Sequence, residues 1–475
     1  SAIRRSDRTG NRRLYSFEMT PFRTLVLAAA LTFGIVPSSA WAQISDTFVL
    51  TPAQVELTAF GALRSGEPAR ALALSEALLV RDSQDLIALR IASQAALEIG
   101  QPDVAVRHGR TLYRTADSDD LQFFAARVVS LAFAQMEDFT RAQLWLRRAR
   151  QVAPNDAAAQ SVAQDYAAVR QRNPLTFNLD FGVRPSSNVN NGSSESTFEL
   201  FGLTFLLSPS AQELSGNQIS VGATFGYTLQ ESAQSRTAVS VTGEILRYTL
   251  SAEAQDSAPT FDVSTLNYDR VVVGVQHDWL AGREAQPLKA TFNYGLSWVG
   301  GDIYARDLSA GLSTNWAIGQ RSSIQTGVRF GHVTYFESGN VSDSVAIDLG
   351  WTHALNQGQS IYVRNSFERT NSADATSLNS DRTSLSIGYN FGRLAETFDV
   401  GVEVGAQWRK YDPDTTSPDG RSDLRTDLTL NIGFPLVEYY GFSPIASLEA
   451  YRTNSNVSRY QSEGISLDLT VRSNF

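Results

Sequence analysis

From residue 197 to the carboxyl end, apolar and polar positions alternate with a period of two in segment after segment. The last segment, 464–475, is the clearest. One face carries Ser473 and five apolar side chains, and the other carries glycine, polar and charged residues; the apolar ones are Ile465, Leu467, Leu469, Val471 and Phe475. A strand that meets hydrocarbon on one side and water on the other must alternate in this way. The pattern therefore predicts membrane-crossing strands.

The alternating segments are numerous enough to close a barrel. Candidate strands lie at 197–207, 217–229, 237–250, 263–278, 288–304, 307–316, 323–336, 344–354, 360–370, 383–391, 397–409, 424–434, 445–453 and 464–475. They predict a transmembrane antiparallel β-barrel of about 14 strands over residues 197–475. A soluble β-sandwich would also alternate. It would not explain the terminal aromatic residue Phe475, which we interpret as a signal for the barrel assembly machinery.

Two strands indicate which face meets the lumen. Segments 397–409 and 424–434 each set an apolar face against a charged one. A charge on the lipid face costs about 2–4 kcal/mol at the bilayer midplane. The charged faces are therefore predicted to line the lumen, with Glu403, Arg409, Arg425 and Asp427 on them. In 237–250 the alternation changes phase between Ile245 and Leu246, which predicts a bulge or a strand end.

Connection lengths orient the barrel. Short links alternate with long polar ones at 251–262, 371–382, 410–423 and 454–463. Short turns face the periplasm in outer-membrane barrels, so both barrel ends are predicted to be periplasmic, which requires an even number of strands. The alternating stretch 175–183 then has no place, and 174–196, with its Asn188–Asn191 run, is predicted to be a connector or plug. Two alternatives stay open: this stretch is the first strand and two others merge, or the barrel has 16 strands.

Residues 43–173 show helical periodicity instead. Gly66-Glu67-Pro68 recurs as Gly100-Gln101-Pro102, a shift of 34 residues (100 − 66), and more loosely at Glu137. This is the period of tetratricopeptide (TPR) repeats. The region is predicted to be a TPR-like domain whose first helices line a client-binding groove, with Glu56, Arg90, Gln94, Glu98 and Arg127 on it. A plain helical bundle without a groove is the alternative.

The amino-terminal residues have the composition of a targeting segment. Residues 1–18 are polar and basic, and an apolar run follows Met19 and Arg23. The run ends before Ala40-Trp41-Ala42, a small-x-small cleavage pattern. Residues 19–42 are therefore predicted to be a secretory signal peptide, with 1–18 as an upstream segment. Together with the barrel, this predicts the outer membrane of a Gram-negative bacterium and a periplasmic amino-terminal domain.

The composition offers little chemistry. With no cysteine, the chain has no disulfides and no thiolate ligands. Its net charge of −9 argues against a nucleic-acid partner. The four histidines are scattered, so no metal, cofactor or catalytic residue is expected and the chain is predicted not to be an enzyme. A barrel lipase with a triad assembled across strands, and weak calcium binding by 412–420, are alternatives.

A signal sequence, helical repeats and a carboxy-terminal barrel together resemble the surface lipoprotein assembly modulator (Slam) family, over the chain from Gln43 to Phe475. Asn173-Pro174 with the Asn188–Asn191 run is similar to that family's entry to the barrel, and 443–460 is similar to its closing hairpin. The resemblance implies a translocator that takes a lipoprotein or other secreted protein client from the periplasm to the cell surface. The pair 197–207 and 464–475 would be its lateral opening.

Two other functions remain possible from the sequence. An exopolysaccharide exporter also joins helical repeats to an outer-membrane barrel, and it should carry rings of charge matched to its polymer. A passive porin needs no repeat domain. The predicted lumen residues listed above include both acids and bases, so they do not form a ring of one charge sign.

Overall fold

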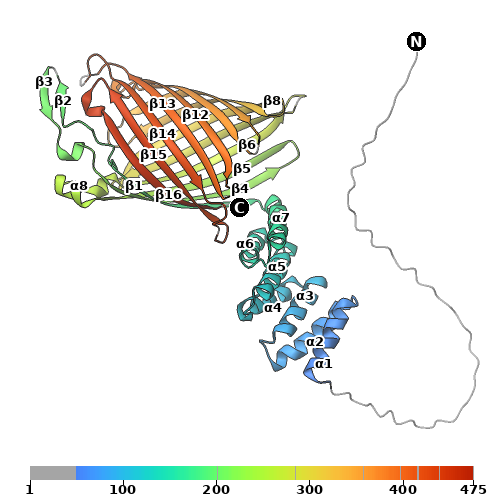
Figure 1. Cartoon of the computed structure of the whole chain (residues 1–475). Helices are drawn as coiled ribbons and strands as arrows, with labels where there is room; N and C mark the ends of the chain where they lie inside the picture. The colour runs from blue at the N-terminus through green and yellow to red at the C-terminus, as the bar shows by residue number, and fades with distance from the viewer. Residues whose placement is uncertain are drawn as a thin grey trace, which may run out of the picture. The chain divides into compact units, whose positions relative to one another are not determined.

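The computed structural model describes residues 50–473 apart from 201, 284, 357, 396, 415–416 and 438. The predicted upstream segment 1–18, the signal peptide 19–42 and Phe475 lie outside the described residues. The described chain has a helical region that ends at Arg172 and a β region that begins at Leu175 (Figure 1). Within it, no helix combines the length and the apolar character needed to cross a membrane.

The helical region consists of seven helices in residues 52–172, each packed against the next in sequence. They are α1 (Pro52–Arg64), α2 (Pro68–Arg81), α3 (Leu86–Glu98), α4 (Pro102–Thr115), α5 (Asp119–Gln135), α6 (Phe139–Gln151) and α7 (Asp156–Arg172). Proline begins α1, α2 and α4, where the missing amide would lack a helical partner in any case. The predicted helical domain is therefore present, and its assignment to the TPR class stays a prediction.

The turns between paired helices repeat as the sequence does. Gly66 and Gly100 adopt left-handed φ angles of +76° and +74°, and Glu137 adopts +59° at the third turn. A glycine tolerates this conformation without strain. The small residues Ala59, Ser93 and Ser130 are at most 1% exposed, so the helices approach closely at these points. The loose third match in the sequence is therefore a real structural equivalent.

The β region is a closed barrel of 14 strands, each antiparallel to its neighbours. They are β1 (Leu175–Ser186), β4 (Gly216–Glu231), β5 (Ser235–Leu250), β6 (Tyr268–Ala281), β7 (Gln286–Val299), β8 (Asp302–Ile318), β9 (Ser322–Tyr335), β10 (Val341–Ala354), β11 (Ser360–Asn371), β12 (Ser380–Leu394), β13 (Phe398–Tyr411), β14 (Ser422–Gly433), β15 (Phe442–Ser455) and β16 (Ser462–Ser473). The α + β fold class and the predicted strand number are confirmed.

The identity of the first strand was predicted wrongly. The segment 175–186, assigned to a connector or plug within 174–196, is β1 and pairs with both β4 and β16. Residues 197–200 and 203–206 instead form a small separate hairpin, β2 (Thr197–Leu200) and β3 (Leu203–Leu206), and Gly202 ahead of β3 has φ +75°. The prediction included 197–207, which is not a barrel strand, and left out 175–186, which is one. The total therefore stayed right, and the open 16-strand alternative falls.

The connections distinguish the two ends of the barrel, which we call the turn end and the loop end. The turn end carries the barrel start at Leu175 and links of three to eight residues, such as 232–234 and 434–441. The loop end carries the long links 187–215, 251–267 and 412–421, and also four of two to eight residues, 300–301, 336–340, 372–379 and 456–461. The last two are shorter than the predicted long links 371–382 and 454–463. Long loops therefore gather at one end, as expected, although not every connection there is long.

The predicted bulge in β5 is absent. The β4–β5 ladder continues in register past Ile245 and Leu246 to Leu250, whereas the β5–β6 ladder ends at Leu246. Of the two expectations, a bulge or a strand end, the bulge is wrong, and only the pairing with β6 ends here. The change in pattern has another cause: past Ile245 the outer face carries Arg247, whose guanidinium contacts the Asp269 carboxylate at 2.8 Å. On the inner face Leu250 is 8% exposed and packs with Leu214 in a loop cluster. The strand therefore leaves the apolar zone at this point.

Candidate functional site: the lumen wall and the seam between β1 and β16

The inner wall of the barrel is polar. Large apolar side chains on alternate positions point outward and are exposed, for example Val404 (55%) on β13 and Leu428 (49%) on β14. Glu403, Arg409, Arg425 and Asp427 lie on the opposite positions. Glu403 and Asp427 line the same hollow of about 410 Å³. The structure thus places all four on the lumen face of β13 and β14.

Two lumen tyrosines lie flat against the wall over glycines of the next strand. Tyr362 on β11 covers Gly388 on β12 and donates its hydroxyl to Glu403 on β13. Tyr451 on β15 covers Gly464 on β16, where an added Cβ would lie 2.7 Å from the ring. Arg425 stacks on the Tyr451 ring at 3.9 Å. This arrangement turns large side chains along the wall and away from the centre of the lumen.

Lumen charges are paired across strands. Six arginines each contact an acid: Arg184–Glu449, Arg270–Asp307, Arg329–Asp348, Arg364–Glu403, Arg382–Glu368 and Arg425–Glu449. Pairing leaves no broad stretch of one sign among these residues. A surface of this kind is polar but does not match a strongly anionic or cationic polymer.

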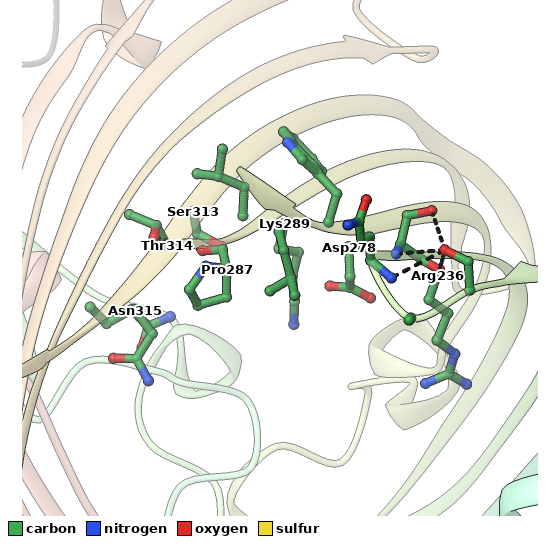
Figure 2. Close-up of a pocket in the computed structure, with 15 residues that line it drawn as sticks. Arg236, Asp278, Pro287, Lys289, Ser313, Thr314 and Asn315 are labelled. Carbon is green, nitrogen blue, oxygen red and sulfur yellow. Dashed lines mark hydrogen bonds between the residues drawn. The ribbon is translucent and has the colours of Figure 1, made fainter. Parts of the chain in front are cut away.

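One hollow of about 490 Å³ lies in the lumen wall at the turn end, lined from β5 to β9 (Figure 2). Arg236, Asp278 and Lys289 are among the residues that line it. Arg236 donates to the Thr228 hydroxyl at 2.9 Å. The hollow therefore combines both signs of charge, as the rest of the wall does.

The ladder between β1 and β16 is the shortest in the barrel among the described residues. Its pairs are Asp180↔Arg472, Phe181↔Val471, Gly182↔Thr470, Val183↔Leu469 and Ser186↔Ser466. By contrast, β1 pairs with β4 along its whole length, from Leu175 to Ser186. Pro185 lies in the interruption, where it has no amide hydrogen to give. We call this closing ladder the seam.

Arg184 bridges the seam on the lumen side. Its Nε donates to the Ser466 hydroxyl of β16 at 2.9 Å, and its Nη2 reaches over that strand to Glu449 on β15. Glu449 also accepts from Arg425 on β14 at 3.2 Å. A charged chain therefore ties β1 to three strands on the far side of the seam.

The loop 187–215 crosses the seam at the loop end. Asn188, 6% exposed, donates to the carbonyls of Gly192 and Glu463 at 3.0 Å each. The Ser193 hydroxyl donates to the Ser458 carbonyl at 3.2 Å, and the Ser194 amide to the Gln461 carbonyl at 2.9 Å. The Asn188–Asn191 run, predicted as part of a plug, thus belongs to this loop. No sequence pattern singled out Arg184 or Glu449, although Arg184 directly follows the alternating stretch 175–183.

The predicted groove residues are only partly brought together. Arg90, Gln94 and Glu98 share one face of α3, where Gln94 donates to Glu98 at 2.8 Å. Arg90 lies 4.9 Å from the ring of Phe124 on α5. Arg127 pairs with Asp165 on α7 at 2.6 Å, a partner that the sequence did not suggest. Glu56 is half-buried on α1.

The histidines lie apart from one another. His277 contacts the Thr237 hydroxyl at 2.8 Å and His353 contacts the Ser322 hydroxyl at 2.7 Å, both through Nδ1. Neither ring has a carboxylate partner among the described contacts. On α4, burial lowers the pKa of His108, whose Nε2 lies 3.7 Å from the Glu76 carboxylate. Within the described part of the chain, no three His, Asp or Glu residues are grouped as a metal ion would need.

No protein-family model and no curated protein matches the sequence. Solved structures that match part of the chain include an outer-membrane channel from Pseudomonas putida F1, with 9% identity, 64% of this chain and 96% of that chain covered, and a TM-score of 0.34. OmpT of Vibrio cholerae has 8% identity, coverages of 63% and 97%, and a TM-score of 0.35. A bacterial polysaccharide outer membrane secretin has 8% identity, coverages of 63% and 98%, and a TM-score of 0.34.

Other matches cover a smaller share of the chain. The type III secretion translocator chaperone SycD of Yersinia enterocolitica shares 18% identity, with 28% of this chain and 96% of that chain covered, at a TM-score of 0.24. The strand order and register above, and not these values, establish the closed barrel with a helical domain ahead of it.

Proposed function

We propose that the chain is an outer-membrane translocator that moves surface lipoproteins or related secreted protein clients from the periplasm to the cell surface. The observation that carries the proposal is the seam. Its ladder is short and interrupted at Pro185. Among the described residues, its separation exposes the fewest backbone donors and acceptors, and each such group costs free energy when it is left without a partner.

The chain order supports a protein client. The helical domain ends at Arg172 and the seam strand β1 begins at Leu175, so a client held on the helices would be delivered beside β1. A TPR-like surface with a charged α3 face suits an extended peptide. Arg90, Gln94 and Glu98 would contact it.

The lumen supports this function over polysaccharide export. An exporter of a charged polymer needs unpaired charges of the opposite sign along its path. Here the two charges of the Arg364–Glu403 pair neutralise each other, and so do those of the Arg329–Asp348 pair. A wall of this kind attracts no particular sign and suits clients of varied sequence. A porin remains the second alternative, but it gives the helical domain no role.

A disulfide across the seam tests the proposal directly. The chain contains no cysteine, so Val183→Cys with Leu469→Cys introduces a single possible bridge between directly opposed positions. The probe is an epitope-tagged surface lipoprotein that is produced in the same cells and detected by antibody on intact cells. We expect oxidation to abolish its display and reduction to restore it, because a covalent link prevents the strands from separating.

The control places the same bridge in an ordinary ladder. Leu430 on β14 faces Leu448 on β15, so Leu430→Cys with Leu448→Cys locks a pair that need not open. This variant should display the lipoprotein in both redox states. Undiminished display by the oxidised seam variant would refute lateral opening. Display that is independent of the whole chain would refute the translocator function.

A further inference from the structure

Three charged side chains lie next to one another on the lumen wall at the turn end. Arg236 on β5 is opposed in register to Asp278 on β6, and Asp278 is opposed to Lys289 on β7 (Figure 2). Each lies an odd number of positions from an outward-facing apolar residue of its own strand, so all three face the lumen. Those apolar residues are Val241, Val275 and Phe292. We call Arg236, Asp278 and Lys289 the turn-end row.

The charges of the turn-end row are separate from one another. Among the described residues, neither Arg236 nor Lys289 lies close enough to a carboxylate for an ion pair. Neutral groups hold the row instead: Arg236 donates to the Thr228 hydroxyl at 2.9 Å, and Gln276 donates to the Asp278 carboxylate at 2.6 Å. The six lumen arginines named above, in contrast, each contact an acid. The turn-end row therefore offers three charges that a ligand can meet.

The order of these charges defines the ligand that fits them. Two bases on either side of one acid give the row a net charge of +1 and the order positive, negative, positive. Neighbouring strands lie about 4.8 Å apart, so the backbone positions of the row span roughly 10 Å. The long side chains of Arg236 and Lys289 can fold toward Asp278 from both sides. The complementary ligand is a small molecule with a positive group between two negative ones.

The hollow around the turn-end row has the size and lining of a small-molecule site. Its volume of about 490 Å³ lies within the usual range of about 300–1,000 Å³. Lys289 is exposed to the lumen, and Ser313 opposes it in register. Asn315 and Gln325, opposed on β8 and β9, also line the hollow. A polar ligand therefore meets neutral hydrogen-bonding groups beside the three charges.

We propose that this hollow binds a dicarboxylic amino acid, such as glutamate. The two carboxylates of the ligand contact Arg236 and Lys289, and its ammonium group contacts Asp278. A simple anion is repelled by Asp278, whereas the ammonium group gives that carboxylate a partner. The site lies in the wall of the closed barrel and needs no opening of the seam, so it is a further function beside the movement of protein clients.

The lysine content of the chain allows a direct binding test. The sequence contains two lysines, Lys289 and Lys410. Lys410 lies on the outer face of β13, two positions from the outward-facing Trp408. Full chain grown with ε-¹³C-lysine therefore gives two lysine signals by NMR in detergent micelles, which Lys289→Gln and Lys410→Gln assign. We expect L-glutamate to shift the Lys289 signal to saturation and to leave the Lys410 signal in place.

Matched ligands test each contact on the natural chain. Glutarate is glutamate without its ammonium group, and L-glutamine lacks the side-chain carboxylate. Each should bind about tenfold or more weakly than L-glutamate, because each loses one charged contact. The inference is overturned if L-glutamate leaves the Lys289 signal unmoved. It is also overturned if glutarate or inorganic phosphate shifts that signal at the same concentration as L-glutamate.

Two variants locate the preference for the ammonium group. Asp278→Asn should bind glutarate and L-glutamate within about twofold of each other. Asp427→Asn removes a lumen carboxylate on β14, outside the hollow, and should keep the natural preference for L-glutamate. A preference that survives Asp278→Asn would contradict the assignment. These measurements do not involve lipoprotein display, so their outcome is independent of the proposed translocation.

Discussion

Arg184 on β1 reaches over β16 to donate to Glu449 on β15, so one guanidinium spans the closing ladder of the barrel. Both side chains are no more than 30% exposed. Elsewhere the same geometry occurs away from the seam, where Arg270 on β6 reaches over β7 to Asp307 on β8 at 3.0 Å. Substitution of Arg184 and of Arg270 in turn therefore distinguishes the effect of a weaker seam from that of a lost lumen ion pair.

Arg184→Gln should weaken the seam by about 1.5–3 kcal/mol, the usual contribution of a hydrogen bond to a charged group. We expect more frequent conductance increases in planar bilayers, because a weaker seam opens more often. We also expect a lower unfolding temperature in gel-shift assays. Arg270→Gln should lower the unfolding temperature similarly without raising conductance. Equal conductance of the two variants would show that Arg184 has no special role at the seam.

Gly388→Ala should destabilise the barrel because a methyl group at this position overlaps the ring of Tyr362. The expected loss is about 1–3 kcal/mol, typical of overpacking. Chemical unfolding in micelles, followed by tryptophan fluorescence, measures it. Gly243→Ala on β5 is the control, since an added Cβ there meets nothing within 4 Å. The prediction fails if both alanines have the same effect.

Asn188→Ala should free the loop 187–215 from the seam. The change removes the donations to Gly192 and Glu463 and an amide donation from Gly192 at 2.8 Å. We expect proteinase K to cut this loop at least several-fold faster on intact cells. Asn217→Ala, at an exposed position at the start of β4, should leave the cutting rate unchanged. If Asn188→Ala leaves the cutting rate unchanged, Asn188 does not hold this loop against the seam.

The helical domain should lose stability in mild acid through His108. Burial holds the pKa of His108 below its usual 6.5. The unfolded chain therefore binds the proton first as the pH falls, and the free energy of unfolding decreases below about pH 6.5. Thermal melts at 222 nm on the full chain, at pH 7.5 and pH 5.5, report mainly the helices. His108→Gln should flatten the difference; an unchanged difference would assign it to other groups.

The sequence predicted the barrel well because alternation is imposed by the two solvents that a strand meets. Faces were therefore assigned correctly at strands such as 424–434, where Leu428 and Asp427 point opposite ways. The first strand is assigned wrongly because the fourteen segments that include 197–207 already satisfy the even strand number, which leaves 175–183 without a place although it alternates without a break. Alternation alone does not distinguish a barrel strand from a hairpin in a loop. Only pairing partners decide that, and they are not local in sequence.

The candidate site was less predictable for the same reason. Arg184 and Glu449 lie 265 residues apart, and their contact depends on the register of three strands. The phase change at Leu246 was visible, but its cause was not a bulge. It marks the height at which Arg247 replaces apolar side chains on the outer face. A change of the solvent around a strand and a bulge in its backbone both interrupt the apolar–polar alternation of the sequence in the same way.

Surface display in a second Gram-negative host tests the central claim most directly. The host lacks this chain and expresses an epitope-tagged surface lipoprotein, and antibody labelling of intact cells is the measurement. We predict labelling only when the full chain is also expressed, and loss of labelling when residues 52–172 are removed while the barrel is retained. Labelling without the chain, or a chain that admits only small solutes and displays no lipoprotein, would contradict the account.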